Sequence, residues 1–539
     1  MSERISVLIA GGGPVGLTLA IDLGWRGVPC TLVERTTEEP TNPRCNTTAA
    51  RSMEHFRRLG IADEIRASGL PDDYPTDVVY RTRFGGDEML RIDLPSSSMV
   101  KTEGVDDDLW PTPEPQHRVA QIFLEPILLE RARSFASNDI RHGTELVSFV
   151  QHDDHVEAVL RDLASGEEEV VKADYLVGCD GARSIVRKGI DAKFEGIEAI
   201  NNTVSSYVRS KRLGEINAER PAWMAFTYNH EIISFMVAID GKDLWLHHAN
   251  FPPDVDHSQF DTGDLLARSA GEEVDYELLG EVRWTSRAMV ADRFSDRRVL
   301  LAGDAAHIWI PVGGFGMNAG IQEATELAWM LSAMHHGWGG GHLLDAYEKE
   351  RRPLGMMVAQ AARRIGQNLG ALELRHDVEK PGKEGANARK EIAAMIEAAN
   401  RRQFNPVGLN FGYHYDGSPL IEPDGTPPPE FEIDLYEPDA RPGNRLPHIN
   451  VNGGTPVFDK LGTDFTLIRV GEDAPGADQL AAAAKARGIP LEILTLSEPQ
   501  AAELYRAKLV LVRPDQHVAW RGDSEPDDAL AVIDRVRGA

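Results

Sequence analysis

Three glycines and a glutamate near the start of the chain have the spacing of a dinucleotide-binding site. Gly11, Gly13 and Gly16 form a G-x-G-x-x-G motif directly after an apolar, strand-like run and directly before a helical pattern. In this setting Gly11 permits a tight turn, Gly13 lets the backbone approach a pyrophosphate, and Gly16 lets the helix pack close to the strand. Glu34 ends the next apolar strand, where its carboxylate can accept hydrogen bonds from ribose hydroxyls. The motif predicts a dinucleotide site, although a turn that serves packing alone could carry the same glycines.

Two later motifs place acidic side chains directly after further predicted strands. Asp180 and Gly181 form the first of these motifs, and Gly303 and Asp304 form the second. The Asp304 carboxylate can hydrogen-bond a polyol hydroxyl. The glycine-rich turn over residues 311–318 leads into a helix, whose N-terminal N–H groups can stabilise negative charge on a reduced flavin ring. Together these features narrow the predicted dinucleotide to FAD.

The middle of the chain carries aromatic and histidine side chains on predicted strands. Residues 190–285 alternate as an antiparallel sheet would. Tyr228, His230 and His247 are candidates there for exchanging a proton with a substrate. His247 and His248 point to opposite faces of one strand, so at most one of them can face a pocket. Core packing is the alternative for each of these side chains.

The order of predicted elements gives an α/β fold of several domains, as expected for 539 residues. A Rossmann-like FAD-binding domain is interrupted by an antiparallel sheet, and the C-terminal β-α-β-β-α order resembles thioredoxin. No cysteine lies beyond Cys179, so we expect that last domain to have no disulfide-exchange role. The predicted boundaries are 1–75, 116–189 and 286–375 for the FAD-binding domain, 76–115 and 190–285 for the substrate domain, 376–429 for a linker and 430–539 for the thioredoxin-like domain.

Composition excludes several partner classes. The formal net charge of −28, from 57 basic and 85 acidic side chains, disfavours binding to nucleic acid or to anionic membranes. Cys30, Cys45 and Cys179 form no C-x-x-C pair, so neither a disulfide framework nor a metal site is expected. The predicted nucleotide-binding strand begins by Ile5, which leaves no room for a signal peptide, so a cytoplasmic protein is expected.

The three motifs in this order resemble the single-component FAD-dependent aromatic hydroxylases, the family typified by para-hydroxybenzoate hydroxylase. The resemblance covers about residues 1–370. The segments at 42–44 and 51–54, and the C-terminal domain with its ending at 511–521, resemble the phenol hydroxylase branch. The family fold is a Rossmann-like FAD-binding domain of the GR2 type with an inserted substrate domain.

The resemblance implies a reaction and a set of FAD-binding residues. NAD(P)H reduces FAD, oxygen adds to give a flavin hydroperoxide, and the terminal oxygen is transferred to a phenolic ring. By matching motifs, Arg51 and Gln121 should contact FAD, and the turn that begins at Pro311 should line its isoalloxazine ring. The residues predicted to bind FAD are Gly11, Gly13, Pro14, Val15, Gly16, Glu34, Arg35, Arg44, Arg51, Gln121, Asp180, Gly181, Gly303, Asp304, Pro311, Gly314, Gly316, Met317 and Asn318.

One position departs from the pattern of the branch. Five residues before Arg51, where relatives often have an acid or a histidine proposed as a base, this chain has Asn46. A neutral amide cannot take up a proton. Either another residue is the base or Asn46 only orients the phenol. The predicted catalytic residues are Asn46, Tyr228, His247 and Pro311.

The predicted function is FAD-dependent, NAD(P)H-using hydroxylation of a phenolic ring by molecular oxygen. One alternative is a tailoring monooxygenase that acts on a polyketide-like or antibiotic ring by hydroxylation, epoxidation or Baeyer–Villiger insertion. Another is a flavin-binding protein without enzymatic activity. The expected partners are a small aromatic substrate and oxygen, with no nucleic acid and no membrane, and a homodimer is the expected assembly.

Overall fold

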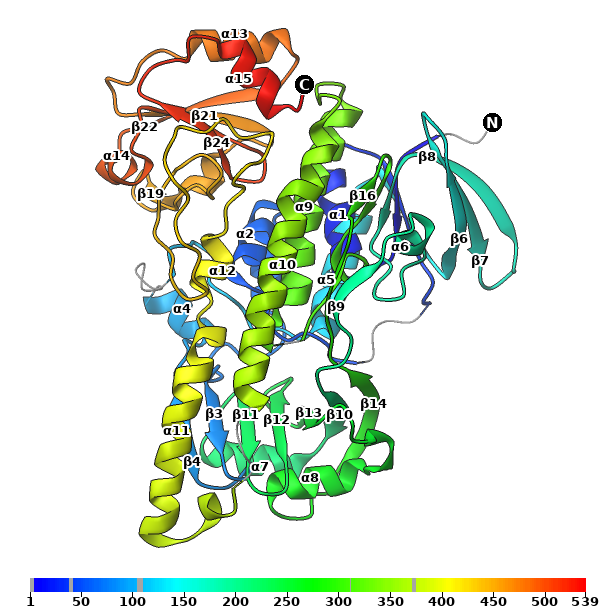
Figure 1. Cartoon of the computed structure of the whole chain (residues 1–539), viewed down its shortest axis with the longest axis vertical. Coiled ribbons are helices and arrows are strands. Elements are labelled where there is room, and N and C mark those ends of the chain that lie inside the picture. Colours follow the sequence, from blue (N-terminus) through cyan, green and yellow to red (C-terminus); the bar gives the residue numbers. More distant parts are fainter. Residues whose placement is uncertain (1–3, 38–41, 104–109, 311, 371–374) are drawn as a thin grey trace.

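Three main sheets organise the part of the chain that the computed structural model describes, residues 4–37, 42–103, 110–310, 312–370 and 375–539 (Figure 1). The mixed α/β fold confirms the predicted fold class. Within the described residues, no helix combines the length and the apolar character that a membrane span requires. The shorter elements are α3 (Ala62–Arg66), α4 (Ser97–Glu103), α6 (Ile185–Gly189), α12 (Val407–Phe411), β9 (Phe194–Ile197), β15 (Ala288–Ala291), β18 (His307–Ile308), β19 (Asn450–Val451) and β20 (Thr455–Pro456).

The first sheet is built around the opening strand. Strand β1 (Ile5–Ala10) lies parallel between β2 (Cys30–Glu34) and β8 (Glu168–Gly178). Its last four residues are buried, as expected for a parallel strand covered on both faces by helices. The other strands are β5 (Asn138–His142), β6 (Thr144–Gln151), β7 (Val156–Asp162), β16 (Ser295–Asp296) and β17 (Val299–Leu301). Helix α1 (Pro14–Trp25) packs between α5 (Gln121–Arg133) and α9 (Phe315–His335).

The second sheet has seven strands in the order β14-β10-β13-β12-β11-β3-β4. Its neighbours are antiparallel except β3 and β11, which are parallel. The strands are β3 (Val78–Arg81), β4 (Glu88–Ile92), β10 (Asn202–Arg209), β11 (Met224–Tyr228), β12 (Ile233–Ala238), β13 (Leu244–Phe251) and β14 (Glu277–Thr285). Helices α7 (Lys211–Glu219) and α8 (Thr262–Ala270) interrupt this predicted strand-rich region, and α8 covers one face of the sheet.

Helix α11 (Gly382–Phe404) lies where the sequence predicts a linker. Its apolar side chains Ile392 and Ile396 are buried in the core of the second sheet, against which the helix packs. This part of the 376–429 segment therefore contributes to a hydrophobic core and does not serve only as a spacer.

The third sheet has the order β22-β21-β23-β24, with β21 and β22 parallel and the other pairs antiparallel. This is the arrangement expected of a thioredoxin-like unit. The strands are β21 (Phe465–Val470), β22 (Leu491–Leu496), β23 (Leu509–Val512) and β24 (Val518–Gly522), and the helices are α13 (Asp478–Ala486), α14 (Pro499–Tyr505) and α15 (Ala529–Val536).

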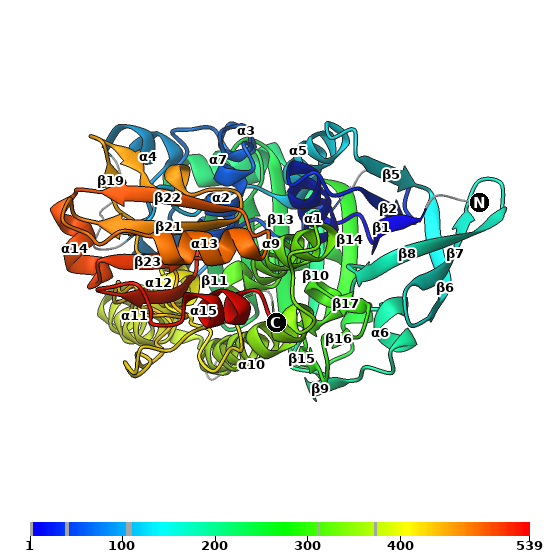
Figure 2. The ribbon, with the colours of Figure 1, turned by 90° about the horizontal axis from the view of Figure 1, so that it is seen from above.

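Buried ion pairs join the third sheet to the rest of the chain. Arg513, directly after β23, makes two hydrogen bonds of 2.7 and 2.8 Å to Glu350 of α10 (Leu343–Gly370), and both side chains are fully buried. Glu54 of α2 (Ala50–Arg58) pairs with Arg51 at 2.7 Å and with Arg445. Figure 2 shows the third sheet alongside α2 and α9. This unit is therefore held by internal charges as well as by apolar packing.

Candidate active site

The three motif glycines play three different steric roles. Gly11 has a φ of +110°, and a Cβ built there would lie 2.2 Å from the carbonyl oxygen of Cys179. A Cβ at Gly16 would lie 2.0 Å from the Gly11 oxygen. At Gly13 a Cβ would meet no atom within 4 Å, and its backbone is extended with a φ of −73°. Gly11 and Gly16 are thus required by the fold itself, whereas Gly13 borders open space that suits a pyrophosphate.

The Glu34 carboxylate is fixed beside this turn. Its Oε2 accepts a hydrogen bond from the Gly12 N–H at 2.7 Å, and its Oε1 accepts one from the Thr36 N–H at 2.8 Å. The side chain is only partly buried. It therefore stays available to the ribose hydroxyls that the sequence predicts as its ligands.

Asp180 presents an unpaired oxygen at the end of β8. Its Oδ2 accepts a hydrogen bond from the Ile185 N–H at 2.7 Å at the start of α6. Its Oδ1 is buried and has no hydrogen-bond partner among the described residues. Gly181 follows with a φ of +75° and open space where a Cβ would stand. A buried carboxylate oxygen without a donor fits a site that receives a hydroxyl from a bound cofactor.

A glutamate that the sequence analysis missed supports the Gly303–Asp304 turn. Glu323 Oε2 accepts the Gly303 N–H at 2.8 Å, and Glu323 Oε1 lies 2.8 Å from His307 Nε2. Both side chains are fully buried. Asp304 itself is exposed. Glu323 stands 19 residues after Asp304, inside an apolar helix, and only the packing of α9 on the turn brings it there.

The glycine turn before α9 is held by Asn318. Gly313 and Gly314 have φ values of +72° and +69°, and the helix begins at Phe315. The Asn318 Nδ2 group donates to the oxygens of Gly314 and Thr47 at 2.7 and 2.9 Å. Its Oδ1 accepts the Ala49 N–H and the Ser52 hydroxyl. The Asn318 side chain is thus fully used within the protein and positions this turn, and its contact with FAD stays a prediction.

The remaining predicted residues around this turn differ in accessibility. Gly316 has open space where a Cβ would stand, and Met317 is half-buried. A cavity borders the turn, with walls that include Thr47, Gly313, Phe315, Asn318, Leu354 and Tyr413. Pro311 lies outside the described residues, so its predicted catalytic role has no structural account.

The contacts of Arg51 in the structure lie within the protein, and its contact with FAD stays a prediction. Its guanidinium donates to Glu54, to Gln516 and to the Asp515 oxygen, the last at 2.6 Å, and it is fully buried. Its distant partners come from the turn between β23 and β24, whose residues 515–516 lie against α2. Arg51 therefore holds the C-terminal unit.

Three other residues predicted to bind FAD lie near the strand ends that carry the glycine and aspartate motifs. Arg35 and Arg44 are exposed. Gln121 donates its backbone N–H to the Cys45 oxygen at 3.0 Å, and its side chain pairs with Glu125. Asn46 lies in the stretch between Cys45 and Thr47 and is partly buried.

An aromatic row crosses one face of the second sheet. It consists of Tyr80, Phe226, Phe235 and His248, which are paired across four neighbouring strands. Successive ring centroids are 4.6, 5.3 and 4.4 Å apart. Phe226, Phe235 and His248 are only half-buried. Tyr228 lies on the same face by strand alternation and is buried.

The structure corrects the choice of His247 as a catalytic residue. His247 lies on the opposite face, is fully buried, and its Nε2 is 2.8 Å from the Ser269 hydroxyl of α8. Alternation along β13 instead puts His248 into the aromatic row. The His248 Nδ1 lies 2.7 Å from the Ser205 hydroxyl, which accepts a hydrogen bond from Trp284 Nε1 at 2.7 Å.

Acid is expected to destabilise the fold through these histidines. Burial lowers the pKa of His247 to about 3, whereas an unfolded histidine has a pKa of about 6.5. The unfolded chain therefore binds more protons below about pH 6.5, and the stability from the neutral imidazole is lost as the pH falls toward 3. The apparent unfolding temperature should drop between about pH 7.5 and pH 5, and His247→Asn should lessen that drop. An equal drop in His247→Asn and wild type would contradict this assignment.

Comparisons with known proteins agree with this arrangement. The family model described as "FAD binding domain" matches residues 4–362, and "Aromatic-ring hydroxylase, C-terminal" matches residues 439–539. The chain is 33% identical to the FAD-dependent monooxygenase apdD of Emericella nidulans, over 99% of this chain and 90% of that protein. It is 31% identical to the tetracenomycin B2 monooxygenase-dioxygenase of Streptomyces olivaceus, over 99% and 98%. The solved structure of the rebeccamycin biosynthetic enzyme RebC with reduced flavin is 36% identical, covers 99% of both chains and gives a TM-score of 0.91.

Proposed function

The chain belongs to the FAD-dependent aromatic-ring hydroxylases, and from this premise we propose that it hydroxylates a planar, multi-ring phenol held against the aromatic row. FAD is its cofactor, NAD(P)H is the reductant and molecular oxygen is the co-substrate. When bound and reduced, FAD would activate molecular oxygen for transfer of one oxygen atom to the ring. The residues of the chain hold FAD, orient the phenol and keep water away from both.

The aromatic row is the observation that carries the substrate class. Its three half-buried rings, Phe226, Phe235 and His248, extend over two strand spacings, about 10 Å, and the fourth ring, Tyr80, is buried at the end of the row. Phe226 stacks nearly parallel on the buried Tyr80, at 8°, so Phe226 and its half-buried neighbours can present ring edges above the sheet. Ring edges carry the positive part of the aromatic quadrupole and pack well against the electron-rich face of a flat ring system. The length of the row favours several fused rings over a single one.

The relatives support a biosynthetic role for this reaction. RebC is described as a rebeccamycin biosynthetic enzyme, and the Streptomyces olivaceus relative acts on tetracenomycin B2. By this likeness the chain is a tailoring hydroxylase of an antibiotic-like ring. A single-ring phenol is the second candidate, because 4-methyl-5-nitrocatechol 5-monooxygenase of Burkholderia is also a relative.

A substrate screen tests the proposal. The FAD-loaded chain is incubated with NADH or NADPH and a panel of single-ring and multi-ring phenols. We expect multi-ring phenols to stimulate oxidation of the reductant and to gain one oxygen atom with the ring system intact. An opened or expanded ring would instead indicate Baeyer–Villiger insertion. If no phenol stimulates oxidation, the chain is a flavin-binding protein of another kind.

We propose that His248 orients the phenol by a hydrogen bond. Its Nδ1 is engaged by Ser205, and the described residues offer no partner for its Nε2, which leaves that nitrogen for a ligand oxygen. Removal from water lowers the pKa of His248 to about 3, so the ring is neutral at neutral pH and is a poor base for a phenol. Together with Asn46, it would position a substrate hydroxyl and leave deprotonation to the acidity of the substrate.

Substitution of His248 gives a measurable test of that role. His248→Ala should lower kcat/KM about 2- to 13-fold, because one neutral hydrogen bond contributes about 0.5–1.5 kcal/mol. The shape of the pH–rate profile should stay unchanged, since an orienting group contributes no titration. His257→Ala, outside the second sheet, is the matched control. Loss of the acidic limb of the profile in His248→Ala would show that His248 is the base after all.

We also propose the division of the chain into an FAD-binding unit, a substrate unit and a C-terminal unit. The ranges 1–75, 116–189 and 286–375 contain the strands of the first sheet, which supports the first unit. The ranges 76–115 and 190–285 contain those of the second sheet. A cytoplasmic location follows from the need for NAD(P)H, which cells keep inside. The expected homodimer can be tested by light scattering.

A further inference from the structure

Two histidines and a glutamate gather at the tip of the β6–β7 hairpin. His152 follows β6, His155 precedes β7, and Glu157 is the second residue of β7. The His152 N–H donates to the His155 oxygen at 2.8 Å, which closes a four-residue turn. His155 and Glu157 are two residues apart in an extended segment, so their side chains share one face. The turn thus brings three metal-ligating side chains together on the edge of the first sheet.

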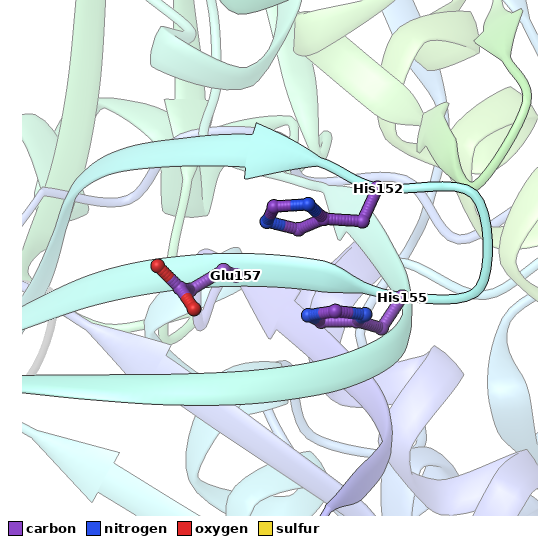
Figure 3. A group of neighbouring side chains, drawn as sticks. All are labelled: His152, His155 and Glu157. Atoms are coloured by element: carbon purple, nitrogen blue, oxygen red, sulfur yellow. The ribbon is translucent and has the colours of Figure 1, made fainter.

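The three side chains are close enough to share an ion. One potential ligand atom from each lies within 4.8 Å of the other two. The two imidazole rings stack with centroids 4.4 Å apart and planes 15° from parallel. Figure 3 shows the two rings one above the other, with the Glu157 carboxylate beside them.

A carboxylate orients one of the rings. The His155 Nδ1 lies 2.8 Å from Asp154 Oδ1. This leaves the Nε2 of His155, which is buried and has no hydrogen-bond partner among the described residues. Metal-binding histidines characteristically give their second ring nitrogen to a carboxylate, which fixes the orientation of the ring. A buried nitrogen without a partner, oriented in this way, is free to accept a ligand.

We propose that His152, His155 and Glu157 bind one divalent transition-metal ion of the zinc class. Two imidazole nitrogens and one carboxylate oxygen are donors that Zn²⁺ accepts, with a fourth position for water. Bonds of about 2.0–2.1 Å in a tetrahedron place ligand atoms about 3.3 Å apart, so the cluster must contract slightly. His152 is exposed and can rotate to do so. The one competing contact found in the described residues, from Lys172 to Glu157 at 3.9 Å, is exposed and weak.

A bound ion would hold the two strands of the hairpin together and would take no part in hydroxylation. A bound ion would join the residue after β6 to the residue before β7 and so resist fraying of this edge. The net charge of −28 raises the local concentration of cations at the surface. Neither the family models nor the relatives described above name a metal.

Zinc titration of the FAD-loaded full chain, with any affinity tag removed, tests the proposal. Calorimetry with ZnCl₂ should show one equivalent bound to wild type and none to the His152→Ala/His155→Ala variant. Glu157→Gln should bind at least about tenfold more weakly, since it loses the charged ligand. His342→Ala is the control, because His342 also lies beside an aspartate, at 3.0 Å, but is not part of the three-residue group.

Thermal unfolding supplies a second measurement. Zinc should raise the apparent unfolding temperature of wild type and of His342→Ala, and should leave the double variant unchanged. Circular dichroism and flavin absorbance of the metal-free variants establish that they are folded. Equal zinc stoichiometry in wild type and the double variant, or no binding to wild type, would overturn the proposal.

Discussion

Replacing Gly13 by valine is expected to give a folded protein that carries almost no FAD. A Cβ at this position meets no protein atom within 4 Å, and the backbone φ of −73° suits any residue, so the substitution should not disturb the apoprotein. The same open space is where the motif places the pyrophosphate, and a branched side chain there would exclude it. The purified variant should be colourless, and FAD released on denaturation should fall from about one per chain to about none.

A second glycine provides the control for this experiment. A Cβ at Gly280 in β14 also meets nothing within 4 Å, and valine is well suited to a strand. Gly280→Val should retain FAD and the yellow colour. Both variants should give the circular dichroism spectrum of wild type. A Gly13→Val protein with a full complement of FAD would refute the assignment of this turn as the pyrophosphate site.

Removing the Glu350 carboxylate is expected to cause the largest loss of stability. Glu350→Ala leaves the fully buried Arg513 without its bidentate partner, at a cost of about 3–5 kcal/mol in the free energy of unfolding. Asp515 still contacts Arg513 at 2.8 Å, so some of the charge stays compensated. Equilibrium denaturation followed by tryptophan fluorescence measures the effect, and limited proteolysis should show the C-terminal unit becoming accessible first.

The specificity of that loss can be tested with two further variants. Glu350→Ala/Arg513→Ala should lower the free energy of unfolding by less than the sum of the two single substitutions. Each single substitution leaves one buried charge without its partner, whereas the double substitution removes both charges. Glu272→Ala removes an exposed partner of Arg212 and should cost less than about 1 kcal/mol. Strict additivity of the Glu350 and Arg513 effects would mean that the ion pair itself contributes little.

Local rules are sufficient to predict the strand ends that carry the motifs. Each motif depends on only a few consecutive residues: the glycine spacing, the acid that ends β2, and the aspartates after β8 and β17. The structure brings all of them to the carboxyl ends of the parallel strands of the first sheet. The thioredoxin-like order could also be predicted, because its strands are short apolar runs separated by turns.

Contacts between distant segments account for what the sequence did not reveal. Arg51 follows a family pattern near the cofactor, yet two of its partners lie more than 460 residues away, in the turn between β23 and β24. Strand alternation separates His247 from His248, but only the packing of α8 decides which of them is covered. In the sequence, Glu323 lies among the residues of an ordinary core helix. Only the packing of α9 against the Gly303 turn reveals its hydrogen bond to the Gly303 N–H.

The strand order of the first sheet also bears on how the protein is made. β1 lies between β2 and β8, and β8 pairs with β17, so the sheet draws on segments from residue 5 to residue 301. At roughly 5–20 residues per second, a ribosome takes about 15–60 s to supply them. For the first part of that time, about 8–35 s until β8 has been made, the nascent β1 has an open edge on the side of β8, where a chaperone or another chain can pair with it. If Asp304 holds FAD as the sequence predicts, cofactor capture waits for that residue, and slow translation before its codon should favour aggregation over holoenzyme.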